Sequence, residues 1–469
     1  MKQKSLLLIV ALFAMQGMWA EHPIVQYSLD PQIVEHRNLN GLQGYLNGLV
    51  NINFDQLVFE YTSLAPDQKS TVRLTASINM PGAVYNKTSK ARALVLYNQY
   101  TTCKKRERIS QDNYDDASLL FNKFERFISI SPDLYGWTLT EDKPQTYCCP
   151  EILAIETVDA WDAAMMLLEQ EGYDFKDLPA FNVGYSSGGD HAMAVQKYVD
   201  EKRPDIFFTA TSTGGAPYDF TTVLETYVKT NFTGYQCALP LVIVAYNETY
   251  NLGLDYKDIF LPPLCDKIDE WILSKDYTSW GINDLIGLDT KIDQMLTPAA
   301  LDYTRGIGKK IYDIFRDKAL CGPWAKWQPN TDTKHFILHS KDDLYIHYHT
   351  GWEMANYLEA HGCDVKTDFS NWDNHVTWGM VVWYVRTILF IENCIADGNA
   401  SYFVDLLENN PNAIPDLFKK INRNPNINLN EEDVPAISLT TDKKADLNSD
   451  GEVNVTDVML MIDQIMGKE

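Results

Sequence analysis

Short apolar runs alternate with segments of helical spacing along most of the chain, from about Gln56 to Ala396. The runs are rich in Val, Ile, Leu and Phe, which is typical of strands buried in a sheet. Strands that alternate with helices predict right-handed crossovers and a mostly parallel sheet covered by helices on both faces. The expected strands are 72–78, 93–97, 127–130, 180–183, 206–210, 335–338 and 365–369, and the expected helices are 152–168, 190–199, 352–360 and 376–391.

The alternation stops between residues 220 and 329. This stretch is rich in Leu, Ile, Tyr and Trp at helical spacing and carries few strand signals. An insertion of that size within an α/β sheet predicts a helical cap. The alternative is a separate helical domain that has no part in a site on the sheet.

The N-terminus has the pattern of a secretory signal peptide. Lys2 and Lys4 precede an apolar run over 6–15, and Ala20 offers a small residue for cleavage. The run is about half as long as the roughly 20 residues that a membrane span needs. We therefore expect residues 1–20 to be removed and the product to be secreted or periplasmic, with no transmembrane segment.

The pattern also changes near the C-terminus. Residues 398–436 are rich in Asn and Pro, which favours an extended linker. A short unit follows at 437–469. The expected organisation is a signal peptide (1–20), an α/β domain (21–397) with the helical insertion at 220–329, the linker (398–436) and the C-terminal unit (437–469).

Composition narrows the function classes. The chain of 469 residues is 45% apolar and carries 40 Lys and Arg against 64 Asp and Glu, a net charge of -24. Such an acidic surface repels phosphate backbones, so we exclude nucleic acid as a partner. The eight cysteines are scattered and form no CxxC pair. In an exported protein we expect some of them to pair as disulfides, although their connectivity stays open.

The strongest chemical signal lies in the segment from Phe181 to Gly189, FNVGYSSGG. Gly184 and Gly188 flank Ser186 in the spacing G-x-S-x-G, between an expected strand and an expected helix. A nucleophile on such a turn needs neighbours without bulky side chains, because the backbone there is sharply bent. The pattern predicts that Ser186 is a nucleophile. The alternative is a glycine-rich turn with a helix-capping serine.

A serine hydroxyl needs a base and an orienting acid, which follow it along the chain in this kind of fold. Asp343 follows the expected strand 335–338 and is our choice for the acid, because Ile346 can pack beneath its loop. Asp342 is the alternative. His375 follows the strand 365–369 and is the expected base. The alternative for His375 is a helix-capping or surface histidine.

Two backbone amides are needed to bind the oxyanion. The amide of Ser187 directly follows the nucleophile, and the turn after strand 93–97 should supply the second. We expect Thr101 to be that residue, with Tyr100 as the neighbouring candidate.

A metal hydrolase is the less favoured alternative. His347 and His349 could share a metal, but no HExxH motif and no matching set of ligands accompanies them. His191 follows the nucleophile too closely to be the base and is interpreted as a residue on a helix face. No cofactor is therefore expected for catalysis.

Residues of about 56–396 resemble the α/β-hydrolase superfamily, with the secreted lipases and esterases as the most similar group. The resemblance rests on the serine turn, on Ser131-Pro132-Asp133-Leu134-Tyr135-Gly136 and on Gly214-Gly215-Ala216-Pro217-Tyr218-Asp219. It implies hydrolysis of carboxylic esters through an acyl-enzyme. The chain departs from the family at Gln99-Tyr100, where related hydrolases carry a His-Gly pair.

The C-terminal unit resembles a single dockerin type I repeat. Six residues have the spacing of a calcium loop, Gly451 stands at the sharp turn, and Asp replaces the usual Glu at the last position. A complete dockerin has two repeats, so a protein partner stays an open expectation. The expected calcium ligands are Asp446, Asn448, Asp450, Glu452, Asn454 and Asp457.

Together these features predict an exported esterase or lipase that acts on a small-molecule, lipid or acylated-glycan ester. A serine peptidase of the same fold and a catalytically silent binding module are the alternatives.

Overall fold

The computed structural model describes residues 27–38, 54–111, 126–371 and 374–395. The signal peptide, the linker and the calcium loop predicted from the sequence lie outside the described residues. No helix in the described ranges is long and apolar enough to cross a membrane.

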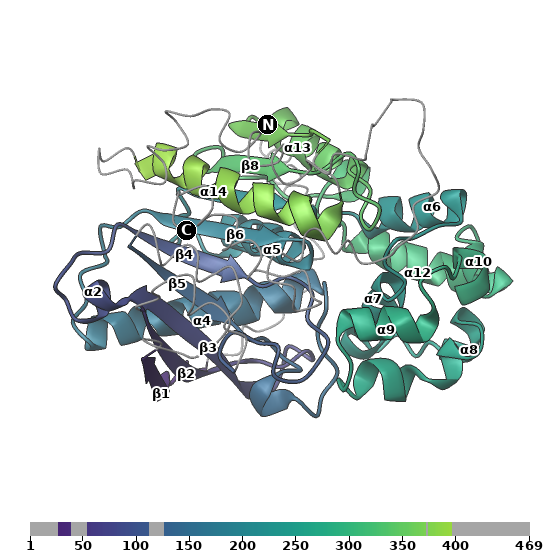
Figure 1. Cartoon of the computed structure of the whole chain (residues 1–469), viewed down its shortest axis with the longest axis horizontal. Coiled ribbons are helices and arrows are strands. Elements are labelled where there is room, and N and C mark those ends of the chain that lie inside the picture. The colour runs from purple at the N-terminus through teal and green to yellow at the C-terminus, as the bar shows by residue number, and fades with distance from the viewer. Residues whose placement is uncertain (1–26, 39–53, 112–125, 372–373, 396–469) are drawn as a thin grey trace, which may run out of the picture.

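Nine strands of the described residues form one sheet, in the order β1-β2-β3-β5-β4-β6-β7-β8-β9 (Figure 1). From β1 to β5 the neighbours in this order are antiparallel, and from β5 to β9 they are parallel. The strands are β1 (Gln32–Asn38), β2 (Phe54–Leu64), β3 (Thr71–Pro81), β4 (Ala93–Asn98), β5 (Phe127–Pro132), β6 (Ala180–Tyr185), β7 (Ala210–Gly214), β8 (Lys334–Leu338) and β9 (Val365–Asp368).

Helices cover both faces of the sheet. Successive side chains of a strand point to opposite faces. On β7, Thr211 donates to Gln196 of α5, whereas Ser212 contacts Thr387 of α14, so α5 and α14 lie on opposite faces. The helices and short turns outside the insertion are α2 (Gly82–Tyr85), η2 (Thr138–Thr140), α4 (Pro150–Gln170), α5 (Ser187–Lys202), α13 (His349–Ala360), η6 (His375–Gly379) and α14 (Met380–Ile395).

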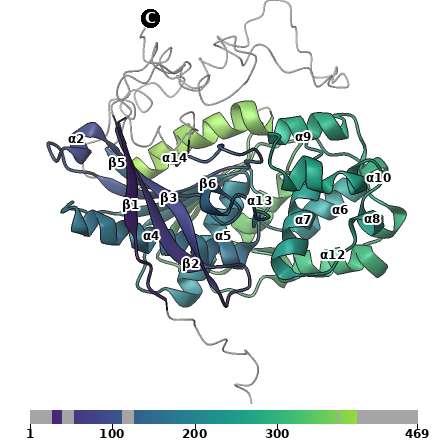
Figure 2. The same cartoon turned by 90° about the horizontal axis from the view of Figure 1, so that it is seen from below.

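A helical insertion connects β7 to β8 and lies beside the sheet (Figures 1 and 2). Its apolar core is built around residues such as Leu241, Ile259 and Phe315, and it continues into the α/β part through Cys103 and Ile152. Its elements are α6 (Phe220–Thr230), α7 (Ala238–Tyr250), α8 (Tyr256–Ile259), η3 (Leu264–Asp266), η4 (Asp269–Leu273), α9 (Ser279–Ile286), α10 (Ile292–Met295), α11 (Pro298–Leu301), α12 (Gly306–Asp317) and η5 (Gly322–Trp324).

The strand predicted at 206–210 is displaced, because β7 begins at Ala210. Phe207 is half exposed and Phe208 is buried against α4, so the apolar residues before β7 pack at its entrance. The strand itself is mostly polar, and its Thr and Ser side chains are buried through hydrogen bonds to neighbouring elements. An apolar pattern cannot reveal such a strand.

The disulfide prediction is wrong for this structure, in which all eight cysteines are free. Most of them are buried within apolar clusters, where a cysteine packs as a small hydrophobic side chain. The cysteines are Cys103, Cys148, Cys149, Cys237, Cys265, Cys321, Cys363 and Cys394.

Candidate active site

Ser186 lies on the sharp turn between β6 and α5, with φ 57° and ψ -129°. Its amide donates to the carbonyl of Gly214 over 2.8 Å. A Cβ atom on Gly184 would lie 2.0 Å from the carbonyl oxygen of Gly188, and one on Gly188 would lie 2.1 Å from that of Asn98. Both positions therefore require glycine, as the G-x-S-x-G pattern predicts.

Ser186, His375 and Asp343 form a continuous chain of hydrogen bonds. The Ser186 hydroxyl lies 2.8 Å from Nε2 of His375, and Nδ1 of His375 lies 2.5 Å from Oδ2 of Asp343. Because a carboxylate only accepts, Nδ1 carries the proton, which leaves Nε2 free to accept from the serine. The structure thus brings together the three residues that were predicted from distant parts of the sequence.

Asp343 is buried and held from several sides. Its Oδ1 accepts from the amides of Tyr345 and Ile346 over 2.8 and 2.9 Å. Burial alone would raise its pKa, but the adjacent imidazoles of His375 and His339 hold that pKa well below its usual range. Asp342, the alternative acid, is exposed and accepts from Asn371 instead.

His339 is a functional candidate that the sequence reasoning missed. It follows β8 directly, and its Nε2 lies 3.2 Å from Oδ2 of Asp343 and 2.9 Å from the carbonyl of Ile346. Both neighbours are acceptors, so Nε2 carries the proton and donates. His339 is therefore a positioning residue for Asp343. The sequence signal that could have indicated this role is the position of His339 four residues before Asp343.

The His375 ring is held by aromatic neighbours at the first turn of η6. The Tyr185 hydroxyl donates to the His375 carbonyl over 2.7 Å. The rings of Tyr185 and Tyr345 each lie 5.2 Å from the imidazole, measured between centroids. A Cβ on Gly215 would come within 3.1 Å of the imidazole Cε1, so this glycine leaves room for the ring.

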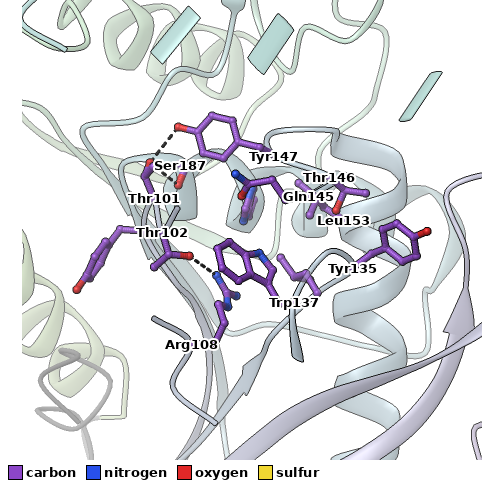
Figure 3. A pocket seen from close by; sticks show the side chains of 13 residues that line it. Thr101, Thr102, Arg108, Tyr135, Trp137, Gln145, Thr146, Tyr147, Leu153 and Ser187 are labelled. Carbon is purple, nitrogen blue, oxygen red and sulfur yellow. Dashed lines mark hydrogen bonds between the residues drawn. The ribbon is translucent and has the colours of Figure 1, made fainter. Parts of the chain in front are cut away.

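The turn after β4 lies against the start of α5. The Thr101 hydroxyl donates to the Ser187 hydroxyl over 3.1 Å and also contacts the Tyr147 hydroxyl at 2.9 Å (Figure 3). The structure therefore places the two residues predicted for the oxyanion hole beside each other. Amides in the first turn of a helix have no intrahelical partner, so the start of α5 can donate to an anion.

A small pocket with a volume of about 20 Å³ opens beside these residues (Figure 3). Its wall combines aromatic and polar side chains, which suits a substrate with polar groups. The lining residues are Tyr100, Thr101, Thr102, Arg108, Leu134, Tyr135, Trp137, Gln145, Thr146, Tyr147, Leu153, Ser187 and His191.

The insertion reaches the triad through an aromatic cluster. Tyr235 stacks on Tyr345 with centroids 5.2 Å apart, and Trp280 lies 5.9 Å from both rings. Tyr345 in turn packs against His375. The Gly234 amide also donates to the Leu344 carbonyl over 3.0 Å. The insertion thus contacts the loop that carries Asp343.

The predicted calcium ligands at Asp446, Asn448, Asp450, Glu452, Asn454 and Asp457 lie outside the described residues. His347 and His349 are near each other, with their Nδ1 atoms 2.9 Å apart, at the start of α13.

Solved structures of low sequence identity share this architecture. A Legionella pneumophila protein provisionally named a hydrolase aligns with a TM-score of 0.66 at 16% identity, over 80% of this chain and 100% of its own. The rice cell wall degrading esterase LipA from Xanthomonas oryzae gives 0.62 at 17% identity, over 81% and 97%. Candida antarctica lipase A gives 0.55 at 13% identity, over 80% and 83%.

No family model matches the sequence, and no curated protein matches it. The similarity between this chain and the solved structures is therefore a similarity of fold. The sheet order, the helices on both faces and the three structural neighbours show that the described chain has the α/β-hydrolase fold.

Proposed function

We propose that this protein is an exported serine hydrolase that cleaves carboxylic esters through an acyl-enzyme. The observation that carries the proposal is the chain of hydrogen bonds from Ser186 through His375 to Asp343, at a strained turn between a strand and a helix. The α/β-hydrolase fold and two neighbours named as an esterase and a lipase support the same chemistry.

In the proposed reaction the Ser186 oxygen attacks the ester carbonyl while Nε2 of His375 takes its proton. Asp343 stabilises the resulting imidazolium. The tetrahedral intermediate then breaks its bond to the alcohol, which leaves with the proton from His375. A water molecule, deprotonated by His375, attacks the acyl-serine in the same way and releases the carboxylic acid. No cofactor takes part in these steps.

The amides of Ser187 and Thr101 are proposed to stabilise the oxyanion. Ser187 begins α5, and the positive end of that helix favours negative charge at the same place. The contact between the Thr101 and Ser187 hydroxyls fixes the β4 turn against the helix start, which keeps the two amides in register.

The substrate is proposed to be a small-molecule, lipid or acylated-glycan ester. The helical insertion would form one wall of the substrate site through Tyr235 and Trp280, and the pocket beside Thr101 would take polar groups. The C-terminal repeat is proposed to bind calcium and to offer a docking segment for a protein partner. We propose from the signal-peptide pattern that the protein is secreted or periplasmic.

The test is hydrolysis of p-nitrophenyl esters by wild type and Ser186→Ala. Removal of the nucleophile should lower kcat on the order of a million-fold. Ser131→Ala is the matched control, because Ser131 is also a buried serine at the end of a strand and should keep full activity. Faster cleavage of peptide amides than of esters would favour a peptidase, and an inactive wild type would favour a silent binding module.

A further inference from the structure

Three side chains that the proposed reaction does not use come together behind the nucleophile turn. Cys148 lies before α4, and Asp190 and His191 are the fourth and fifth residues of α5. The thiol sulfur, a carboxylate oxygen and a ring nitrogen all lie within 4.8 Å of one another. The three residues are only 0%, 3% and 6% exposed, respectively.

Two atoms of this cluster have unmet hydrogen-bonding capacity. Oδ2 of Asp190 and Nε2 of His191 are buried and have no hydrogen-bond partner among the described residues. Buried side-chain polar atoms usually have at least one partner, so a pair on adjacent residues facing one cluster is unusual. A species that bridges sulfur, oxygen and nitrogen would satisfy both atoms at once.

We propose that Cys148, Asp190 and His191 bind one zinc ion. Zinc accepts thiolate, imidazole and carboxylate ligands in a tetrahedral arrangement. Its usual bond lengths place ligand atoms roughly 3.3 to 3.8 Å apart. The three atoms of the cluster lie within 4.8 Å of one another, so side-chain adjustments of about 1 Å would bring them to this spacing.

The charges of the ligands fit a divalent cation. A thiolate and a carboxylate together balance two positive charges, so the occupied site is neutral. This matters because the start of α5 is positive and because Arg108 lines the same pocket as His191.

One ligand of the cluster, His191, also lines the pocket beside Thr101. His191 and Thr146 both line it, and Oγ1 of Thr146 is also buried without a partner among the described residues. We propose that a water molecule from the pocket occupies the fourth position of the tetrahedron. The ion would connect the start of α5 to the segment before α4 and so brace the turn that holds Ser186.

The experiment measures the metal content of the full chain, purified without chelator and with calcium in excess, so that the C-terminal loop is saturated. Wild type should contain about one zinc per chain, and Cys148→Ser, Asp190→Asn and His191→Gln should each lose it. The matched control is His335→Gln, which replaces another buried histidine without partners in the described structure and should retain zinc.

A second measurement identifies the sulfur ligand without relying on variants that fold poorly. Wild type stripped of metal and reloaded with CoCl2 should show a near-ultraviolet thiolate-to-cobalt band, and folded Cys148→Ser should not. Zinc sulfate should also raise the thermal midpoint of stripped wild type. The proposal is overturned if folded wild type neither contains nor takes up zinc, or if the three variants retain it. Both outcomes are independent of esterase activity.

Discussion

Asp343 uses one carboxylate oxygen to hold its own loop and the other to contact the base. One oxygen accepts from two backbone amides and the other contacts His375 and His339. The carboxylate is therefore fixed before any substrate arrives, and it sets which nitrogen of His375 carries the proton. This assigns Asp343 the orienting role in the proposed reaction.

Asp343→Asn should lower kcat for p-nitrophenyl acetate by about 10⁴-fold, because an amide favours the wrong tautomer of His375. The matched control is Asp342→Asn, which changes the neighbouring exposed carboxylate and should keep nearly full activity. Steady-state kinetics of both variants decide the matter. Greater loss in Asp342→Asn would reverse the assignment.

At this scale the sequence predicts the residues whose roles depend on local spacing. The glycines around Ser186 are required by contacts within a few residues and with the β4 turn, so the motif carries the information. His339 was missed because its contact with Asp343 depends on how the loop after β8 folds back. No pattern in the linear sequence reports that curvature.

In the proposed function, the helical insertion is the element that would influence substrate choice most directly. Trp280 is 44% exposed and packs against Tyr235 and Tyr345, next to the imidazole of His375. An exposed tryptophan at that place offers apolar contact area to an acyl chain.

Trp280→Ala should therefore raise KM for longer p-nitrophenyl esters such as the octanoate by roughly tenfold, the effect of losing about 1.4 kcal/mol of contact. The acetate should be hydrolysed almost as by wild type, because it does not reach the ring. A panel of acyl chain lengths measures the difference. Trp324→Ala, which changes an exposed tryptophan of η5, is the control. An equal change for acetate and octanoate would contradict this role.

Several elements with apolar or amphipathic patterns were predicted within a few residues, such as α4 and β4. The strand β2 was missed although Leu57, Phe59 and Tyr61 alternate along it and are buried. The edge strand β1 was missed because its side chains are mostly polar and exposed. β7 was displaced because its buried Thr and Ser are satisfied by partners on α5 and α14, which only the fold reveals. Where the local pattern of apolar residues gives no signal, tertiary hydrogen bonds thus determine where a strand begins and ends.

At the scale of the whole molecule, ionisable groups buried between the sheet and its helices make the free energy of unfolding depend on pH. Glu156 on α4 is fully buried, with Oε2 accepting from the Tyr135 amide over 3.0 Å. Burial raises its pKa from 4.5 to about 8. In the unfolded chain the Glu156 carboxyl ionises from about pH 4.5 upward, whereas in the folded chain it stays neutral until about pH 8. The contribution of Glu156 to the free energy of unfolding is therefore lost as pH rises toward 8.

Glu156→Gln should remove this dependence. Relative to wild type, the variant should gain stability as pH rises between 5 and 8, by at most about 1.4 kcal/mol per pH unit. Guanidinium unfolding at several pH values measures the difference. Glu169→Gln, on the exposed side of the same helix, should follow wild type. Parallel curves for wild type and Glu156→Gln would contradict the account.

At the scale of the whole chain, the α/β class and the helical insertion follow from the alternation of patterns and its interruption. The state of the cysteines did not follow, because burial of a thiol depends on the packing of distant segments. Cys103 and Cys237, for example, lie in one apolar cluster, although Cys103 follows β4 and Cys237 belongs to the insertion.

The central claim is that the Ser186 hydroxyl is activated by His375 and Asp343. A fluorophosphonate probe tests it most directly, because such probes react with activated serines and leave ordinary hydroxyls unmodified. The account predicts stoichiometric labelling of wild type, with the adduct on the peptide that contains Ser186 by mass spectrometry, and no labelling of Ser186→Ala. A folded wild type that resists the probe, or an adduct on another serine, would contradict it.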